Sequence, residues 1–267
     1  NSEPLILPLK KMPRRALPAP FRRIRVLIVG CGDVGQRAVQ QLLPTSSASQ
    51  QRPHVLALTS TPDQAQNLRN LGVTPLVGNL DHPASLRRLA GIAQRVVHLA
   101  PPPNYGIQDR RSMHLRHALG RGRLPQRLVY GSTTGVYGDC AGQWVDETHG
   151  TQAYTDRAQR RVHAEQQWRA WGLQSGVTVS VLRIPGIYAP NREGGTPRLR
   201  LLKGLPVLVA EEDVYTNHIH ADDLATIVLA ALWRGAPRRT YHACDDTELR
   251  MGDYFDLAAD LYGLPRP

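Results

Sequence analysis

Three glycines in the run Gly30-Cys31-Gly32-Asp33-Val34-Gly35 are the residues whose spacing points most clearly to chemistry. They follow a run of aliphatic residues and precede an amphipathic segment that we predict to be a helix over residues 33–43. A strand, a Gly-x-Gly-x-x-Gly turn and a helix are together typical of a dinucleotide site. We expect Gly30 to make the tight turn, Gly32 to admit a pyrophosphate and Gly35 to let helix and strand pack closely.

The end of the second predicted strand bears on which dinucleotide would bind. A carboxylate there holds the ribose of NAD, but this chain has Thr59, Ser60 and Thr61. We therefore favour NADP over NAD, with these hydroxyls and Arg37 as partners for a 2′-phosphate. The alternative interpretation is that the hydroxyls cap the following helix, and both can hold.

The elements that must position these residues alternate between strand and helix along the chain. The strands are continuous apolar runs, as expected when both faces of a parallel sheet are covered. We predict an α/β fold, a Rossmann-like doubly wound parallel sheet whose ligand lies at the carboxyl ends of the strands. The predicted strands are 25–29, 54–59, 73–77, 95–100, 126–130 and 177–182, and the predicted helices 33–43, 62–71, 83–90, 108–119 and 155–171.

Three regions follow from this pattern. Residues 1–22 are basic and rich in proline, and we expect an extension outside the fold. Residues 23–184 form the predicted NAD(P)-binding domain, and 185–267 a smaller C-terminal substrate-binding lobe interleaved with it. In the lobe we expect strands at 206–209, 215–219 and 241–243 and helices at 221–233 and 251–262.

Composition narrows the classes of partner. The net charge of +11 comes with arginines scattered along predicted helices, without a basic stripe and aromatic platforms, so we expect no nucleic-acid partner. No apolar run is long enough to span a membrane. Three cysteines without paired spacing favour a reduced, cytoplasmic setting. His218 and His220 beside Asp222 and Asp223 lack a known ligand spacing, so no metal site is predicted.

A second motif, Thr133-Thr134-Gly135-Val136-Tyr137-Gly138-Asp139, follows the fifth predicted strand. It resembles a segment of the extended short-chain dehydrogenase/reductases, the NAD-dependent epimerase/dehydratase family. Four further segments resemble motifs of that family in the same order, and the resemblance runs from about Arg25 to the end. These segments are 78–81, 97–101, 182–190 and 217–225.

The resemblance implies roles for individual residues. In that family the residue at Thr133 hydrogen-bonds the reacting oxygen of the substrate. The residues that the resemblance and the glycine turn place on the cofactor are Gly30, Gly32, Asp33, Val34, Gly35, Thr59, Ser60, Asn79, Leu80, Leu99, Ala100, Pro101, Thr133 and Pro185.

The chain departs from the family at the Tyr-x-x-x-Lys pair, which is absent. Aligning the helix on Glu165 puts Arg157 at the Tyr position and Arg161 at the Lys position, and no lysine lies between Lys11 and Lys203. A guanidinium titrates too high to exchange a proton near neutral pH, but it can bind an anion or polarise a carbonyl. The catalytic candidates are Thr133, Arg157, Arg161 and, as a substitute acid, Tyr137; for the arginines the alternative is a solvated basic helix.

Three functions remain open. The first is an NAD(P)-dependent oxidoreductase or epimerase acting on a small polar substrate such as a sugar nucleotide, as the resemblance implies. The second is a dinucleotide-binding sensor or scaffold without catalysis, because the Tyr-Lys pair is missing. The third is a binder of anions or nucleic acid through the basic surface. The resemblance also implies a homodimer paired through helices 108–119 and 155–171.

Overall fold

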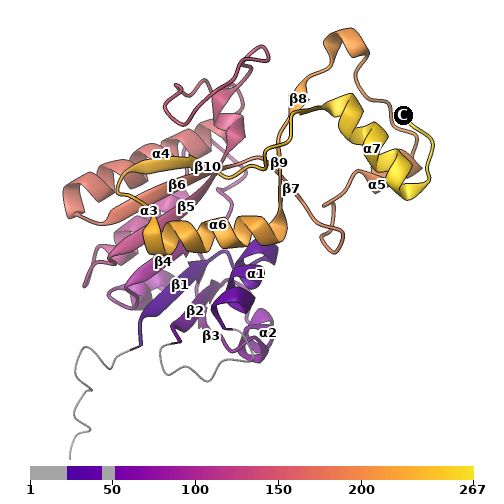
Figure 1. Cartoon of the computed structure of the whole chain (residues 1–267). Helices are drawn as coiled ribbons and strands as arrows, with labels where there is room; N and C mark the ends of the chain where they lie inside the picture. Colours follow the sequence, from indigo (N-terminus) through magenta and orange to yellow (C-terminus); the bar gives the residue numbers. More distant parts are fainter. Residues whose placement is uncertain (1–22, 44–51) are drawn as a thin grey trace, which may run out of the picture.

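The computed structural model describes residues 23–43 and 52–267. The basic extension predicted for residues 1–22 and most of the polar loop after the first helix lie outside this part of the chain. The described residues form a central sheet covered on both faces by helices, with a smaller C-terminal part beside it (Figure 1).

The central sheet has seven strands in the order β10-β6-β5-β4-β1-β2-β3, and every neighbouring pair is parallel. Its inner strands are buried on both faces along most of their length, and their buried residues are mostly apolar. The predicted doubly wound parallel sheet is therefore confirmed. The strands are β1 (Arg25–Val29), β2 (His54–Thr59), β3 (Thr74–Val77), β4 (Arg95–His98), β5 (Arg127–Thr133), β6 (Thr178–Ile184) and β10 (Arg239–His242).

The chain enters the sheet in the middle. From β1 it runs outward to β3, and then returns to β4 on the other side of β1. Val29 at the end of β1 is in register with His98 of β4 and Leu58 of β2. The direction of the chain reverses at the carboxyl ends of β1 and β4, which is where folds of this type bind ligands in a crevice.

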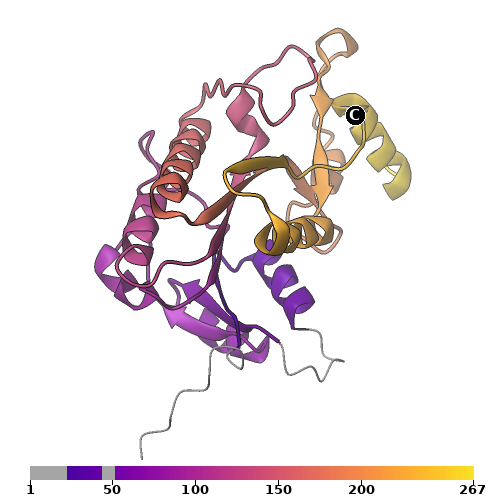
Figure 2. The same cartoon turned by 60° about the vertical axis from the view of Figure 1, so that its left-hand side comes forward.

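Two helical layers cover the sheet (Figures 1 and 2). Each layer has its own apolar core against one face of the sheet, one around Trp168 and Leu115 and the other around Val39 and Leu224. One layer contains α1 (Asp33–Leu42), α2 (Gln64–Asn70) and α6 (Ala221–Arg234), and the other the 3₁₀ helix η2 (Pro83–Leu89), α3 (Arg110–Leu119) and α4 (Asp156–Ser175).

The C-terminal part stands off from the sheet, with α5 and α7 together at one end of the molecule (Figure 1). It has a small core of its own around Leu201 and Phe255. The paired strands β7 and β9 and the paired strands β8 and β11 connect it to the sheet. Its elements are β7 (Gly186–Tyr188), α5 (Arg198–Leu202), η4 (Ala210–Glu212), β8 (Tyr215–Thr216), β9 (His218–His220), β11 (Leu249–Arg250) and α7 (Met251–Tyr262).

Several expected elements differ from those observed. The strand expected at 206–209 does not form: Pro206 lacks an N–H donor, and the segment is mostly exposed, so it has little to pair with or pack against. The strand expected at 215–219 is interrupted at Asn217. Strand β5 runs on to Thr133, three residues beyond the expected end. Both α6 and β10 belong to the layers of the central sheet rather than to the part around α7.

Candidate functional site

The glycine turn after β1 has the backbone that the sequence predicts. Gly30 has a φ of +89°, and a Cβ there would lie 2.3 Å from the backbone N of Ala100. A Cβ on Gly35 would lie 3.0 Å from the Gly30 carbonyl oxygen. A Cβ on Gly32 would meet nothing within 4 Å. Two of the glycines thus allow close packing, while Gly32 faces open space.

That open space lies at the start of α1. No side chain caps the helix, and its first internal hydrogen bond runs from the Gln36 N–H to the Gly32 carbonyl at 2.8 Å. The amides of the first turn consequently point out of the helix end, where a phosphate can accept from them. The residues present therefore fit the pyrophosphate of a dinucleotide.

The end of β4 packs directly against this turn. The N–H groups of Leu99 and Ala100 both donate to the Val29 carbonyl, at 2.8 and 3.1 Å. A Cβ on Gly131 of β5 would come within 2.9 Å of the Leu99 side chain. The fold thus brings Leu99 and Ala100, expected from the sequence at a cofactor, against Gly30, and Pro101 follows them directly.

The other expected cofactor residues lie at neighbouring strand ends. Thr59 Oγ1 accepts from the Thr61 N–H at 3.2 Å and donates to the Thr61 carbonyl at 3.1 Å, so it closes the turn after β2 and does not cap α2. Ser60 is exposed beside it. The amide oxygen of Asn79 accepts from the Asp81 N–H at 2.9 Å, which shapes the turn containing Leu80. Pro185 joins the end of β6 to β7.

Arg111 of α3 fastens two of these loops together. Its guanidinium donates to both carboxylate oxygens of Asp81, at 2.8 and 2.6 Å, and to the Pro101 carbonyl at 3.2 Å. The turn at 79–81 and the loop after β4 are therefore both held to α3. His114 of the same helix adds a contact of 2.7 Å from its Nδ1 to the Leu80 carbonyl oxygen.

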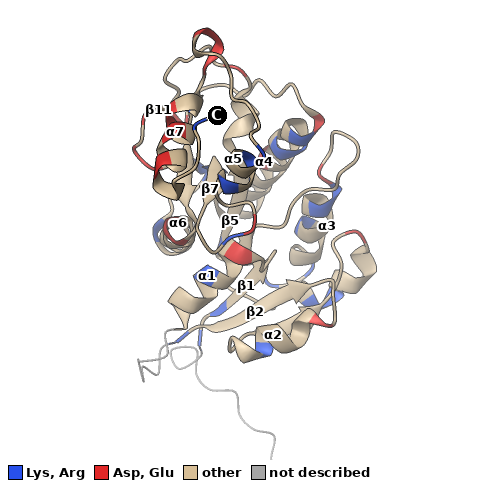
Figure 3. Ribbon diagram, turned by 90° about the vertical axis from the view of Figure 1, so that its right-hand side faces the viewer, with Lys and Arg blue, Asp and Glu red and all other residues tan. Residues whose placement is uncertain are grey.

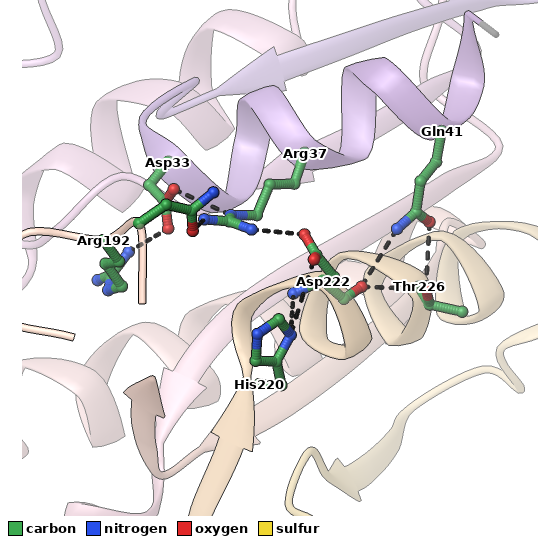
Figure 4. Close-up of polar contacts among 8 residues, drawn as sticks. Asp33, Arg37, Gln41, Arg192, His220, Asp222 and Thr226 are labelled. Carbon is green, nitrogen blue, oxygen red and sulfur yellow. Dashed lines mark hydrogen bonds and ion pairs between the residues drawn. The ribbon is translucent and has the colours of Figure 1, made fainter. Parts of the chain in front are cut away.

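Four charged residues meet beside the glycine turn (Figure 4). Arg192, in the connection after β7, donates to one carboxylate oxygen of Asp33 at 2.5 Å, and Arg37 donates to the other at 3.0 Å. Arg37 also reaches Asp222 of α6 at 2.5 Å and Asn191 at 2.6 Å. These contacts tie α1 to α6 and to the segment after β7.

The network changes the roles expected for its members. Burial alone raises the pKa of Asp33, but hydrogen bonds from Arg192 and Arg37 outweigh it and the pKa is lowered, so Asp33 is ionised. Its charge would repel a pyrophosphate, and the two guanidinium groups offset it. Arg37, expected as a partner for a 2′-phosphate, is instead bound to Asp33, Asp222 and Asn191.

Cys31 lies within the glycine turn. Burial raises the pKa of its thiol to about 11, so the group stays protonated near neutral pH. A protonated thiol is a poor nucleophile. We therefore assign Cys31 no covalent chemistry.

Thr133 ends β5 and begins the 3₁₀ helix η3 (Thr134–Tyr137). Its Oγ1 accepts from the Gly135 N–H at 3.2 Å, which leaves its own hydrogen to donate elsewhere. Tyr137 is only 4 % exposed, and its hydroxyl lies 2.5 Å from His242 Nε2 and donates to the Asp146 carbonyl at 3.1 Å. Burial raises the pKa of Tyr137. Thr133 is therefore the more accessible of the two hydroxyls.

The arginines at the Tyr-Lys positions separate in the structure. Arg157 is exposed on the first turn of α4. Arg161, one turn further, donates to the Tyr130 hydroxyl at 3.1 Å and to the Gly131 carbonyl at 2.8 Å. Arg161 thus holds β5 just before Thr133.

One turn beyond Arg161, Glu165 is buried between α4 and the sheet. It accepts from the Ser132 hydroxyl at 2.6 Å and from Arg183 of β6 through Nε at 3.2 Å and Nη2 at 2.8 Å. Glu165 and Arg183 are each 3 % exposed. The pair fixes α4 to the two strands whose ends carry Thr133 and Pro185.

A buried chain of polar groups fixes the end of β4. The Ser112 hydroxyl donates to Asp109 Oδ2 at 2.7 Å, so the contact of 3.0 Å between His98 Nε2 and Ser112 Oγ requires His98 to donate. Burial lowers the pKa of His98 to about 4, which keeps the ring neutral. His98 is therefore a structural residue below the crevice.

Sequence reasoning missed the residues that hold these loops in place. Arg111, Arg192 and Asn191 lie in loops or on helix faces with no local pattern of their own. One sequence feature pointed near two of them: the segment 182–190, which resembles a motif of the family, ends just before Asn191 and Arg192.

Charge is distributed unevenly over the molecule. Basic residues follow α3, and acidic residues lie on α7 (Figure 3). Across residues 23–43 and 52–267, no group of three or more His, Cys, Asp or Glu could hold a metal ion. No helix in the same part of the chain is long and apolar enough to cross a membrane.

Comparison with known proteins adds a family and a set of similar folds. The model of the NAD dependent epimerase/dehydratase family matches residues 26–244. No curated protein sequence matches the chain significantly.

Among solved structures, a functionally unknown conserved protein from Silicibacter pomeroyi is 28% identical with a TM-score of 0.68, over 91% of this chain and 80% of that one. A putative NAD-dependent epimerase/dehydratase from Methylobacillus flagellatus is 25% identical with a TM-score of 0.69, over 92% and 84%. The UDP-glucose 4-epimerase of Thermus thermophilus, solved with NAD, is 20% identical with a TM-score of 0.72, over 91% and 88%, and shows a shared fold.

Proposed function

Because the chain belongs to the NAD-dependent epimerase/dehydratase family, we propose that it binds a nicotinamide dinucleotide in the crevice between β1 and β4 and acts on a small polar substrate. The observation that carries this proposal is the glycine turn. Gly30 and Gly35 are packed too tightly for a side chain, whereas Gly32 leaves open space before the first amides of α1. A turn that only needed to pack would not require glycine at position 32.

The residues that would hold the dinucleotide come from six strand ends, those of β1 to β6. The amides of Asp33, Val34 and Gly35 would take the pyrophosphate, and residues 99–101 would line the opposite wall. NADP is favoured over NAD, because no carboxylate stands at the end of β2 and Ser60 is exposed there. When bound, the nicotinamide would supply hydride transfer.

The chain's own residues have separate parts in the proposed reaction. Thr133 would donate its free hydrogen to the reacting oxygen of the substrate, with sugar nucleotides as the class to test first. Arg161 would position Thr133 through the Gly131 carbonyl and supply a fixed positive charge. Arg157 is exposed, so we assign it no step. Tyr137 would position His242 rather than act as the acid.

The experiment compares NADH and NADPH binding, by cofactor fluorescence, in the wild type and in Gly32→Val. A Cβ on Gly32 meets no protein atom, so the variant should fold and lose binding. Gly150→Val is the matched control, because a Cβ there also meets nothing within 4 Å, and it should keep binding. If Gly32→Val binds as well as the wild type, the proposed site is wrong.

A second candidate function is a dinucleotide-binding sensor or scaffold without catalysis. It is favoured by one observation: both arginines at the Tyr-Lys positions are unable to exchange protons, and Arg161 donates to the backbone. Turnover of NADPH with a carbonyl or sugar-nucleotide substrate that disappears in Thr133→Ala and survives in Thr133→Ser would exclude this candidate.

Two broader expectations also stay proposals. The three cysteines are free thiols, which supports a reduced, cytoplasmic setting. A homodimer paired through α3 and α4 is supported by Leu173 of α4, which is 67% exposed. Sedimentation equilibrium should then show a dimer that Leu173→Asp dissociates and Leu257→Asp, on α7, does not.

A further inference from the structure

A cavity of about 410 Å³ lies away from the glycine turn, between α4, the edge strand β10 and the loop at residues 147–151. This volume is within the range of pockets that take small molecules, roughly 300–1,000 Å³. The cavity is unusual in its charge, because four arginines line it: Arg169, Arg183, Arg238 and Arg239.

The two carboxylates in the lining are already satisfied. Glu165 accepts from Arg183 and Ser132. Glu147 Oε1 accepts from the backbone N–H of His242 at 3.1 Å, and this hydrogen bond lowers the pKa of Glu147. Positive groups therefore outnumber negative ones, and the hydroxyls of Thr151 and Thr240 add neutral donors around the cavity.

Arg183 contributes a buried donor beside this cavity. It is 3 % exposed, its Nε and Nη2 are bound to Glu165, and its guanidinium lies over the Tyr137 ring, 4.6 Å from the ring centroid. Its Nη1 has no hydrogen-bond partner among the described residues. A buried donor without a partner is destabilising, because its lost hydrogen bond to water is not replaced. An anion oxygen in the cavity would satisfy it.

Arg238 and Arg239 also line the cavity. Both are exposed, and within the described residues neither side chain has an ion pair or a hydrogen bond. Arg169 is partly used, since it donates to the Thr240 hydroxyl and lies 3.7 Å from Glu165. Opposite them, the loop is held in shape by Asp146, whose Oδ1 accepts from the Thr148 N–H at 2.8 Å and from its hydroxyl at 2.6 Å.

We propose that this arginine-lined cavity binds the phosphate group of a small phosphate ester, at a site separate from the dinucleotide crevice. Guanidinium groups suit phosphate because their planar N–H donors match its oxygens in pairs. The rest of the ester would fill the remaining volume. The site connects to the crevice through Arg183, Glu165 and Ser132, which precedes Thr133.

Calorimetric titration at constant ionic strength tests the proposal, with ribose 5-phosphate and inorganic phosphate as probes and ribose as the uncharged control. We expect both phosphates to bind the wild type and ribose to give no signal. Arg238→Ala/Arg239→Ala should weaken binding by about tenfold or more. The matched control Arg87→Ala/Arg88→Ala removes the same charge from another exposed pair and should change binding by less than about twofold.

The remaining outcomes count against the site. If phosphate binding were weakened equally in the two double variants, the phosphates would be attracted by the positive charge of the whole protein and not by this cavity. If phosphate binding were lost in Gly32→Val and unchanged in Arg238→Ala/Arg239→Ala, the phosphate would bind at the start of α1 and not in this cavity. Absence of binding to the wild type would also overturn the proposal. Since NADH binding is measured separately, failure here leaves the proposed function untouched.

Discussion

Gly30 is the residue at which a side chain is least compatible with the fold of the crevice. Gly30 has a left-handed backbone, and a Cβ added to it would lie 2.3 Å from the backbone N of Ala100. Gly176 is also left-handed, with a φ of +74°, but a Cβ added there would meet nothing within 4 Å. We expect Gly30→Ala to cost about 3 kcal/mol or more and Gly176→Ala about 1 kcal/mol. Urea unfolding of both variants measures this. Equal costs would show that only the backbone angle matters.

His98 gives the protein a pH dependence of its own. Burial lowers the pKa of His98 from 6.5 to about 4. Between these two pH values His98 is therefore mostly protonated in the unfolded chain and mostly neutral in the folded chain. Its effect on stability is negligible above about pH 7, and stability is lost as the pH falls from about 6.5 toward 4. At pH 5 the loss is about 2 kcal/mol.

The measurement is urea unfolding at pH 7 and pH 5 in the wild type, in His98→Gln and in the exposed-site control His82→Gln. The difference between the two pH values should shrink in His98→Gln and persist in His82→Gln. A difference that stays the same in all three proteins would assign the pH effect to other groups.

At the scale of elements, the ion pair between Glu165 and Arg183 joins α4 to β6, and the hydrogen bond from Ser132 to Glu165 joins α4 to β5. Replacing Glu165 by Leu leaves the buried Arg183 charge without its partner, which should cost about 3–5 kcal/mol. Removing both charges in Glu165→Leu/Arg183→Met should cost less than the single change, because no isolated charge remains. Chemical denaturation of the two variants compares these costs. A double variant less stable than Glu165→Leu would contradict this account.

At the scale of the whole molecule, Arg192 connects the C-terminal half of the chain to the glycine turn. Arg192→Ala uncovers part of the Asp33 charge at the place where a pyrophosphate would bind, so NADPH affinity should fall by about tenfold. In Asp33→Asn/Arg192→Ala the repulsion is gone and most of the affinity should return. Fluorescence titration measures the dissociation constants. If the double variant binds no better than Arg192→Ala, charge balance is not the reason for the pair.

The sequence by itself determined the fold class and the glycine turn, because both depend on local patterns. Short apolar runs bounded by turn residues, such as residues 26–29 before Gly30, are typical of buried strands, and each alternates with a helical segment, as a parallel crossover requires. The positions of Gly30 and Gly32 relative to strand and helix fix the turn. For the same reason the strand ends carrying Thr59 and Thr133 could be placed at one edge of the sheet.

Only the tertiary structure decided which side chains meet there. Arg37 and Asp222 lie 185 positions apart in sequence and bond at 2.5 Å, because α1 and α6 pack side by side on the same face. The hydroxyl of Tyr137 contacts His242 for a similar reason. His242 lies on β10, which is distant from Tyr137 in the sequence but pairs with β6 in the sheet. The arginine-lined cavity likewise combines α4, β10 and a loop. Contacts between distant segments depend on how layers pack, and no local pattern encodes that packing.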